Sequence, residues 1–212
     1  MDGIVIQLQE EALKKDVDIL TLTRKAYLIA RKLKLKEFEA WINCEQSGYS
    51  IEQEIPDYRK VVGEVKAWNP YHGWIPVVFE KTTPLHEHDI RESLSSLVAA
   101  YKNSDQKACL FMFSSEINAY LSKQSSFSTK FSLQVSVTQI YSIIEQVRNK
   151  ILDWAITLEE NEIVGEGLRF TPEEKDRALN EPLILNYTNN FFSDVMGTQI
   201  QQGTKDSYQK KE

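Results

Sequence analysis

The spacing of apolar residues between positions 137 and 158 predicts one long amphipathic helix. Apolar side chains recur there at intervals of three and four residues, and no glycine or proline interrupts the segment. This rhythm places them on one face of an α-helix for about six turns. The stripe consists of Val137, Ile140, Ile144, Val147, Ile151, Trp154 and Leu158, and it is widened by Ile143, Ala155 and Ile156. We expect the other elements to pack around this stripe; a coiled coil with a second chain is the alternative.

The same analysis predicts three shorter helices before residue 50 and a mixed region after it. The helices cover residues 4–14, 18–33 and 35–46, with Asp18 as an N-cap and Gly48 after the third helix. Residues 58–68 and 75–79 predict a hairpin, in which Pro76 confines the second strand to a sheet edge.

Further elements follow in the second half of the chain. Residues 108–113 predict a buried strand, and residues 131–135 predict a strand that leads into the long helix. Asp89 and Ser114 are candidate helix caps, and residues 171–174 form a capping-box sequence. The predicted fold is therefore α+β, with a helical N-terminal part, a small and mostly antiparallel sheet, and the long helix at its centre.

Composition indicates one domain followed by a polar tail. The chain has 212 residues, and the domain is expected at residues 1–180, with an Asn/Gln-rich tail at 181–212. Apolar runs are too short to cross a bilayer, the N-terminus does not resemble a signal peptide, and Cys44 and Cys109 occur outside any metal-binding motif. These features predict a cytoplasmic protein with free thiols.

The net charge of −6 disfavours general binding to nucleic acid or to an anionic membrane. The charge is nevertheless uneven, because residues 24–36 contain six basic and no acidic side chains, whereas residues 159–181 contain eight acidic ones. Arg24, Arg31 and Lys32 are therefore candidate binding residues, either for phosphate groups or for a protein surface. A solvated helix face is the simpler interpretation. The basic and acidic segments could attract each other within one chain or between chains.

One candidate catalytic set is Asp57, Glu64 and Lys66. Their order resembles the core of metal-dependent nucleases, in which two carboxylates on adjacent strands hold Mg²⁺ and a lysine orients the attacking water. The short interval between the carboxylates argues against this arrangement. The alternative places Asp57 in a turn and the other two side chains on the solvent face of one strand.

No other segment indicates a metal, a cofactor or a covalent mechanism. The sequence from His86 to Asp89 contains four residues of metal-binding type, two of them histidines, but has no further ligand at a suitable spacing nearby. Nucleophile and phosphate-loop motifs are also missing from the sequence. We therefore assign no metal ligands and no cofactor.

Two blocks of the chain resemble the AbiTii domain of bacterial abortive-infection proteins. The first block comprises residues 33–42, Ser47-Gly48-Tyr49, Ile55-Pro56-Asp57-Tyr58-Arg59 and Gly63, and the second comprises residues 147–155 with Gly165 and Phe170. The resemblance spans about residues 5–180 and implies a role in defence against phage. It brings no established catalytic residues.

Tyr58 and Arg59 in the first block are candidate binding residues. Arg59 is expected either to bridge to a carboxylate such as Asp153, which would fix the strands against the long helix, or to bind a phosphate or a partner's carboxylate. The resemblance and the missing catalytic set together predict a defence component that acts through self-assembly or through recognition of a phage or host protein. The alternative is a nuclease toxin that uses Asp57, Glu64 and Lys66.

The tail suggests how assembly would occur. Residues 186–204 are mostly polar but include Phe191, Phe192, Val195, Met196 and Ile200, and residues 195–202 are compatible with a short strand. Such a segment is suited to joining an exposed sheet edge of another protomer. We therefore predict a homo-oligomer that is weakened by deletion of residues 186–212; a disordered terminus is the alternative.

Overall fold

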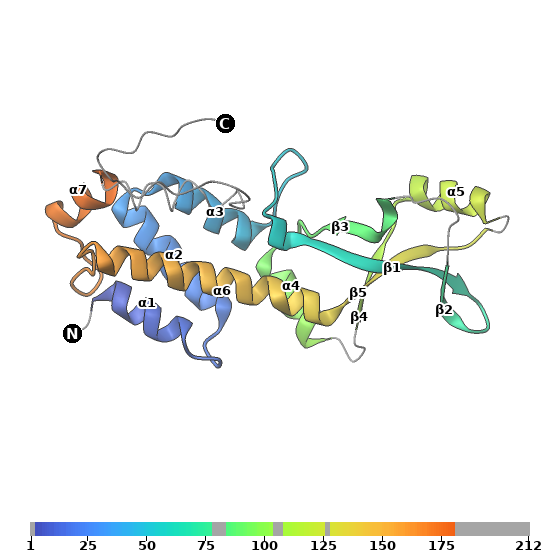
Figure 1. Cartoon of the computed structure of the whole chain (residues 1–212), viewed down its shortest axis with the longest axis horizontal. Helices are drawn as coiled ribbons and strands as arrows, with labels where there is room; N and C mark the ends of the chain where they lie inside the picture. The colour runs from blue at the N-terminus through green and yellow to red at the C-terminus, as the bar shows by residue number, and fades with distance from the viewer. Residues whose placement is uncertain (1–2, 78–83, 104–107, 126–127, 181–212) are drawn as a thin grey trace, which may run out of the picture.

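The computed structural model describes residues 3–77, 84–103, 108–125 and 128–180, and it confirms the α+β fold (Figure 1). Within these residues there are seven α-helices and five strands in one antiparallel sheet. The helices are α1 (Ile4–Ala12), α2 (Ile19–Leu33), α3 (Lys36–Ser47), α4 (Leu94–Lys102), α5 (Ser115–Gln124), α6 (Val137–Glu160) and α7 (Pro172–Asn180). The strands are β1 (Lys60–Asn69), β2 (Gly73–Pro76), β3 (Glu87–Asp89), β4 (Ala108–Met112) and β5 (Phe131–Ser136), and two short 3₁₀ turns are η1 (Asp57–Arg59) and η2 (Pro84–His86).

Helix α6 is the centre of the fold, as its apolar stripe predicts. It contacts α1, α2 and α4, and the residues of its apolar stripe from Ile140 to Leu158 are buried. Trp154 is fully buried and stacks on Phe38 of α3. The stripe is therefore covered within one chain and needs no partner helix. Ile156 departs from the prediction, because 38% of its surface is exposed on the outer side of the helix.

The sheet projects from the helical part along the long axis of the molecule (Figure 1). Its order is β2-β1-β5-β4, and β3 pairs with the first residues of β1. Strand β5 runs directly into α6, whose N-terminus is capped by the Ser136 hydroxyl accepting the Thr138 N–H. Strand β2 lies at a sheet edge, as Pro76 predicts, but it spans Gly73–Pro76, and residues 78–79 of the predicted strand lie outside the described residues. Residues 70–72 form the turn between β1 and β2, and this hairpin lies at the end of the molecule farthest from α7 (Figure 1).

Two predictions for the middle of the chain were wrong. Strand β4 is not buried; it lies at a sheet edge, and 39% of Leu110 and 55% of Met112 are exposed. A strand of apolar residues is buried on both faces only where other elements cover both sides of the sheet. Asp89 does not cap a helix, because it ends β3, and Ser93 caps α4 instead by accepting the Ser96 N–H.

The capping box before α7 forms as predicted. The Thr171 hydroxyl accepts the Glu174 N–H, and the Glu174 carboxylate accepts the Thr171 N–H at 2.8 Å. Glu174 also accepts the N–H groups of Val164 and Gly165. Burial opposes ionisation of Glu174, but these hydrogen bonds outweigh it and hold its pKa below the usual range. Helix α7 packs against α2 near the end of α6.

The predicted tail strand, at residues 186–204, lies outside the described residues. Within the described ranges, no helix combines the length and apolar character needed to span a membrane. Cys44 and Cys109 are free thiols.

Candidate functional site

A buried ion pair joins α3 to the turn before β1. The guanidinium of Arg59 donates through Nη2 to Oε2 of Glu45 at 2.6 Å and through Nε to Oε1 at 3.1 Å, and both side chains are fully buried. The remaining donor, Nη1, bonds the carbonyl oxygens of Ile90 and Glu92 in the segment before α4. One side chain therefore ties together three segments that are far apart in the sequence.

Aromatic side chains complete the surroundings of this carboxylate. The hydroxyls of Tyr49 and Tyr58 donate to Oε1 of Glu45 at 2.6 and 2.7 Å, and the Trp41 indole N–H donates to the Tyr58 oxygen at 2.9 Å. Burial, together with the negative charge of Glu45, raises the pKa of both tyrosines, so both phenols remain protonated donors. Both carboxylate oxygens of Glu45 and all three guanidinium nitrogens of Arg59 are thus hydrogen-bonded within the chain.

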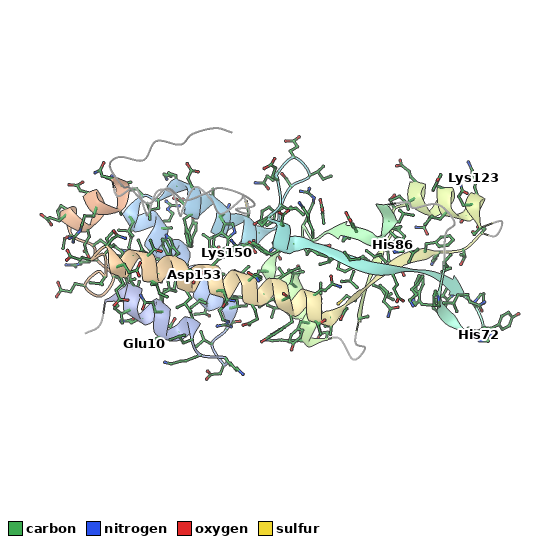
Figure 2. All side chains as sticks on the ribbon, viewed as in Figure 1. Glu10, His72, His86, Lys123, Lys150 and Asp153 are labelled. Atoms are coloured by element: carbon green, nitrogen blue, oxygen red, sulfur yellow. The ribbon has the colours of Figure 1, made fainter. Side chains whose placement is uncertain are left out.

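The geometry favours the structural role of Arg59 over ligand binding, but the carboxylate partner differs from the prediction. Arg59 pairs with Glu45, whereas Asp153 is exposed on α6. Contact with the central helix is made instead by Tyr58, whose ring lies 5.5 Å from Nζ of Lys150. Figure 2 shows Lys150 and Asp153 on α6. The strands are thus held against α6 by this cation–π contact and by the Gln139 side chain of α6, which bonds both the N–H and the carbonyl oxygen of Val62 in β1.

The two carboxylates of the nuclease hypothesis do not lie on adjacent strands. Asp57 lies on η1 and pairs with Lys60, whereas Glu64 and Lys66 pair with each other at 2.7 Å on β1. The Asp57 carboxylate pairs with Lys60 at the start of β1. The backbone of Lys60 lies about 13 Å from that of Glu64 along the extended strand, at about 3.3 Å for each residue. The arrangement matches the alternative, in which Asp57 belongs to a turn.

The basic segment occupies the outer side of α2. Arg24 and Arg31 are exposed and Lys32 is half-buried. Part of the positive charge is compensated within the chain, because Arg31 contacts Glu39 at 3.5 Å and donates to the Tyr27 hydroxyl, and Lys25 pairs with Glu11. The acidic α7 packs against the same helix, so the attraction between the two segments can act within one molecule. A binding role for Arg24, Arg31 and Lys32 stays a prediction.

The histidines do not converge on a metal site. His72 lies in the turn after β1, and Figure 2 shows it at the far end of the sheet from His86. His86 contacts the Gly63 carbonyl oxygen, and His88 lies beside the Phe111 ring. Across the described ranges, no group of three or more His, Cys, Asp or Glu side chains is arranged to hold a metal ion.

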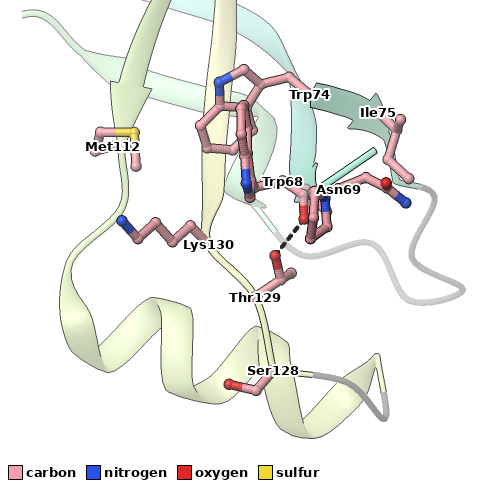
Figure 3. A pocket seen from close by; sticks show the side chains of 10 residues that line it. Trp68, Asn69, Trp74, Ile75, Met112, Ser128, Thr129 and Lys130 are labelled. Atoms are coloured by element: carbon pink, nitrogen blue, oxygen red, sulfur yellow. Dashed lines mark hydrogen bonds between the residues drawn. The ribbon is translucent and has the colours of Figure 1, made fainter. Parts of the chain in front are cut away.

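An open aromatic groove lies beside the β1–β2 hairpin, at the end of the molecule opposite to α7 (Figure 1), and we call it the distal groove; Figure 3 shows the side chains that line it. It has a volume of about 1080 Å³, and the side chains that define it are Trp68, Trp74, Ile75, Met112, Thr129 and Lys130. Trp68 and Trp74 are direct cross-strand neighbours whose rings meet edge to face, with centroids 5.4 Å apart. The Thr129 hydroxyl donates to the Trp68 carbonyl oxygen at 2.6 Å and so ties the start of β5 to the end of β1.

The distal groove combines exposed apolar surface with the positive charge of Lys130. Trp68 is 43% exposed and Met112 is 55% exposed, although both are large apolar side chains. Lys130 extends between them in Figure 3. Exposed apolar surface of this kind, rimmed by polar groups, marks sites of interaction. Among the described strands, β4 pairs with β5 alone, so a sheet edge is also open beside the groove.

Comparison with known proteins decides the family. The AbiTii family model matches residues 3–182. The chain belongs to the AbiTii family. Membership associates this AbiTii protein with abortive-infection defence against phage. No curated protein and no solved structure gives a significant match.

The AbiTii motif residues and the distal groove occupy different parts of the molecule. Trp41, Tyr49, Tyr58 and Arg59 build the buried cluster, which holds the fold together. Gly48, with φ of +92°, is required because a Cβ there would lie 2.9 Å from the Arg91 carbonyl oxygen. The groove was not predicted from the sequence. Its signal was the pair Trp68 and Trp74, which flank a predicted hairpin turn and therefore become cross-strand neighbours.

Proposed function

We propose that this AbiTii protein contributes to antiphage defence by binding another protein molecule through its distal groove, either in self-assembly or in recognition of a partner. The proposal is supported by one observation above all, the exposed tryptophan-lined groove beside an open sheet edge. Tryptophan is among the residue types that contribute most binding energy in protein interfaces. An open edge supplies backbone donors and acceptors for an added strand.

The other candidate sites offer less to a partner. The donors of Arg59 are satisfied inside the fold, and the carboxylates of Asp57 and Glu64 are each paired with a neighbouring lysine. The basic side of α2 is partly compensated by Glu11 and Glu39. At the distal groove, exposed apolar side chains lie beside the backbone hydrogen-bonding groups of the open β4 edge.

The test is phage plating on bacteria that produce the wild-type protein or Trp68→Ala. Removing an interfacial tryptophan typically costs more than about 1.4 kcal/mol of binding free energy, so we expect at least about a tenfold weaker interaction and reduced protection. Ile51→Asp is the matched control, because Ile51 is an exposed apolar residue in another part of the molecule. Equal protection by wild type and folded Trp68→Ala would contradict the proposal.

A further inference from the structure

We infer that the distal groove receives residues 191–200 from a second copy of this chain. The inference rests on the proposed function and names the partner. The apolar side chains of that segment are Phe191, Phe192, Val195, Met196 and Ile200, and its single charged residue is Asp194. The groove presents the complementary surface, two tryptophans and a methionine around Lys130. The segment and the groove are therefore both apolar, and the negative charge of Asp194 is complementary to the positive charge of Lys130.

The distance along the molecule excludes the groove of the same copy for the two phenylalanines of the segment. Val62 of β1 is joined to Gln139 near the start of α6, because its N–H and carbonyl both bond the Gln139 side chain. From Gln139 to Glu160 the helix spans about 32 Å, at about 1.5 Å per residue. From Val62 to Trp68 the strand adds about 20 Å. The two elements follow the same long axis (Figure 1), so about 50 Å separates the end of α6 from the groove.

The chain after α7 is too short to bring the two phenylalanines that far. Asn180 ends α7, which lies beside the end of α6 opposite to the sheet (Figure 1). Phe192 follows Asn180 by 12 residues, a reach of at most about 40 Å in a fully extended chain. The phenylalanines therefore cannot enter the groove of their own molecule. A neighbouring molecule's groove is under no such limit.

Backbone pairing would accompany the side-chain contacts. Residues 195–202 have the composition of a short strand, and the open edge of β4 lies beside the groove at Met112. Strand addition supplies affinity through main-chain hydrogen bonds, and the groove supplies selectivity for the aromatic side chains. The tail follows α7, which lies at the end of the molecule opposite to the distal groove (Figure 1), so the contact joins two different surfaces of the two copies.

Analytical ultracentrifugation of the full chain tests the inference. We expect wild type to sediment as an oligomer at micromolar concentrations, and Phe191→Asp/Phe192→Asp and Trp68→Ala each to self-associate at least about tenfold more weakly. Melting curves of each variant confirm that it is folded before its assembly is compared with that of wild type. Ile51→Asp and Gln209→Asp are the controls, and both should assemble as wild type does.

Mixing the two defective variants is the decisive step. The tail variant retains an intact groove, and the groove variant retains an intact tail. The tail of the groove variant can therefore bind the groove of the tail variant, and the mixture should form a complex containing one copy of each. A mixture that stays monomeric, or a tail variant that assembles as wild type does, would overturn the inference. If the tail variant assembles normally while Trp68→Ala loses phage protection, the inference fails but the proposed function stands. If Trp68→Ala retains protection, the proposed function itself fails.

Discussion

Arg59 and Glu45 form a two-pronged ion pair in which neither side chain has any exposed surface. The pair holds three segments together, because it connects α3 to the turn before β1 and, through Nη1 of Arg59, to the segment before α4. Burial alone would lower the pKa of Arg59, but the attraction of Glu45 outweighs burial and raises it. The guanidinium is therefore charged at every pH at which the protein is folded.

Removing Arg59 should destabilise the protein strongly. Arg59→Met leaves the Glu45 carboxylate buried without its counter-ion, which typically costs about 3 to 5 kcal/mol. The free energy of unfolding in urea measures the effect. Arg31→Met is the control, because the Arg31 side chain lies at the surface and its ion pair with Glu39 should contribute little to stability. Equal losses for the two variants would show that the buried pair has no special role.

Trp154 should be among the residues most important for stability. It is fully buried on α6 and its ring stacks on Phe38, with centroids 3.7 Å apart. Trp154→Ala should cost about 3 to 5 kcal/mol through lost contacts and the cavity left behind. Ile156→Ala, on the outer side of the same helix, should cost much less. An unchanged melting temperature for Trp154→Ala would contradict the packing described for α6.

Glu174 should make the stability depend on pH in the acid range. Its folded-state pKa lies below the value of about 4.3 for an unfolded glutamate. Its contribution is therefore present above pH 4.3 and is lost as the pH falls through the lower, folded-state pKa. Glu174→Gln should lose about 1 to 3 kcal/mol at pH 7, from hydrogen bonds to a charged group. The gap between wild type and variant should narrow toward about pH 3.

Glu173→Gln is the control for this experiment. Glu173 is the exposed neighbour in the same first turn of α7, so its substitution should cost less at pH 7. Urea unfolding at both pH values distinguishes the two. A gap between wild type and Glu174→Gln that stays constant from pH 7 to pH 3 would show that these hydrogen bonds do not lower the pKa of Glu174.

The open edge of β4 makes a further prediction about proline substitution. Trp68 N–H bonds the Lys130 carbonyl, so even-numbered residues of β5 face β1 and odd-numbered ones face β4. Phe111 pairs with Leu133 and therefore bonds β5, whereas the Leu110 N–H points outward. Leu110→Pro should lower the melting temperature only slightly, and Phe111→Pro should lower it strongly. Similar losses for both would contradict this register.

The long helix could be predicted because its burial follows from the sequence period alone. Every stripe position from Ile140 to Leu158 is buried in the structure, and the N-cap Asp18 and the capping box at Thr171 form as expected. These are local signals, in which the partners lie within four residues of each other or on one helical face.

The features that were missed depend on distant segments. Glu45 is a polar residue inside α3, and its burial is visible only once Arg59, 14 residues later, is placed beside it. Strand β4 was predicted as buried because its residues are apolar, but the sequence does not show whether a second layer covers its outer face. The distal groove likewise needs the register of β1 with both β2 and β5.

The central claim is that defence depends on the distal groove and not on the nuclease-like carboxylates. A single phage-plating experiment tests it by comparing Trp68→Ala with the triple variant Asp57→Ala/Glu64→Ala/Lys66→Ala, after melting curves confirm that both are folded. We predict that the triple variant protects as wild type does and that Trp68→Ala loses protection. Loss of protection by the folded triple variant, with full protection by Trp68→Ala, would contradict the account and favour the nuclease.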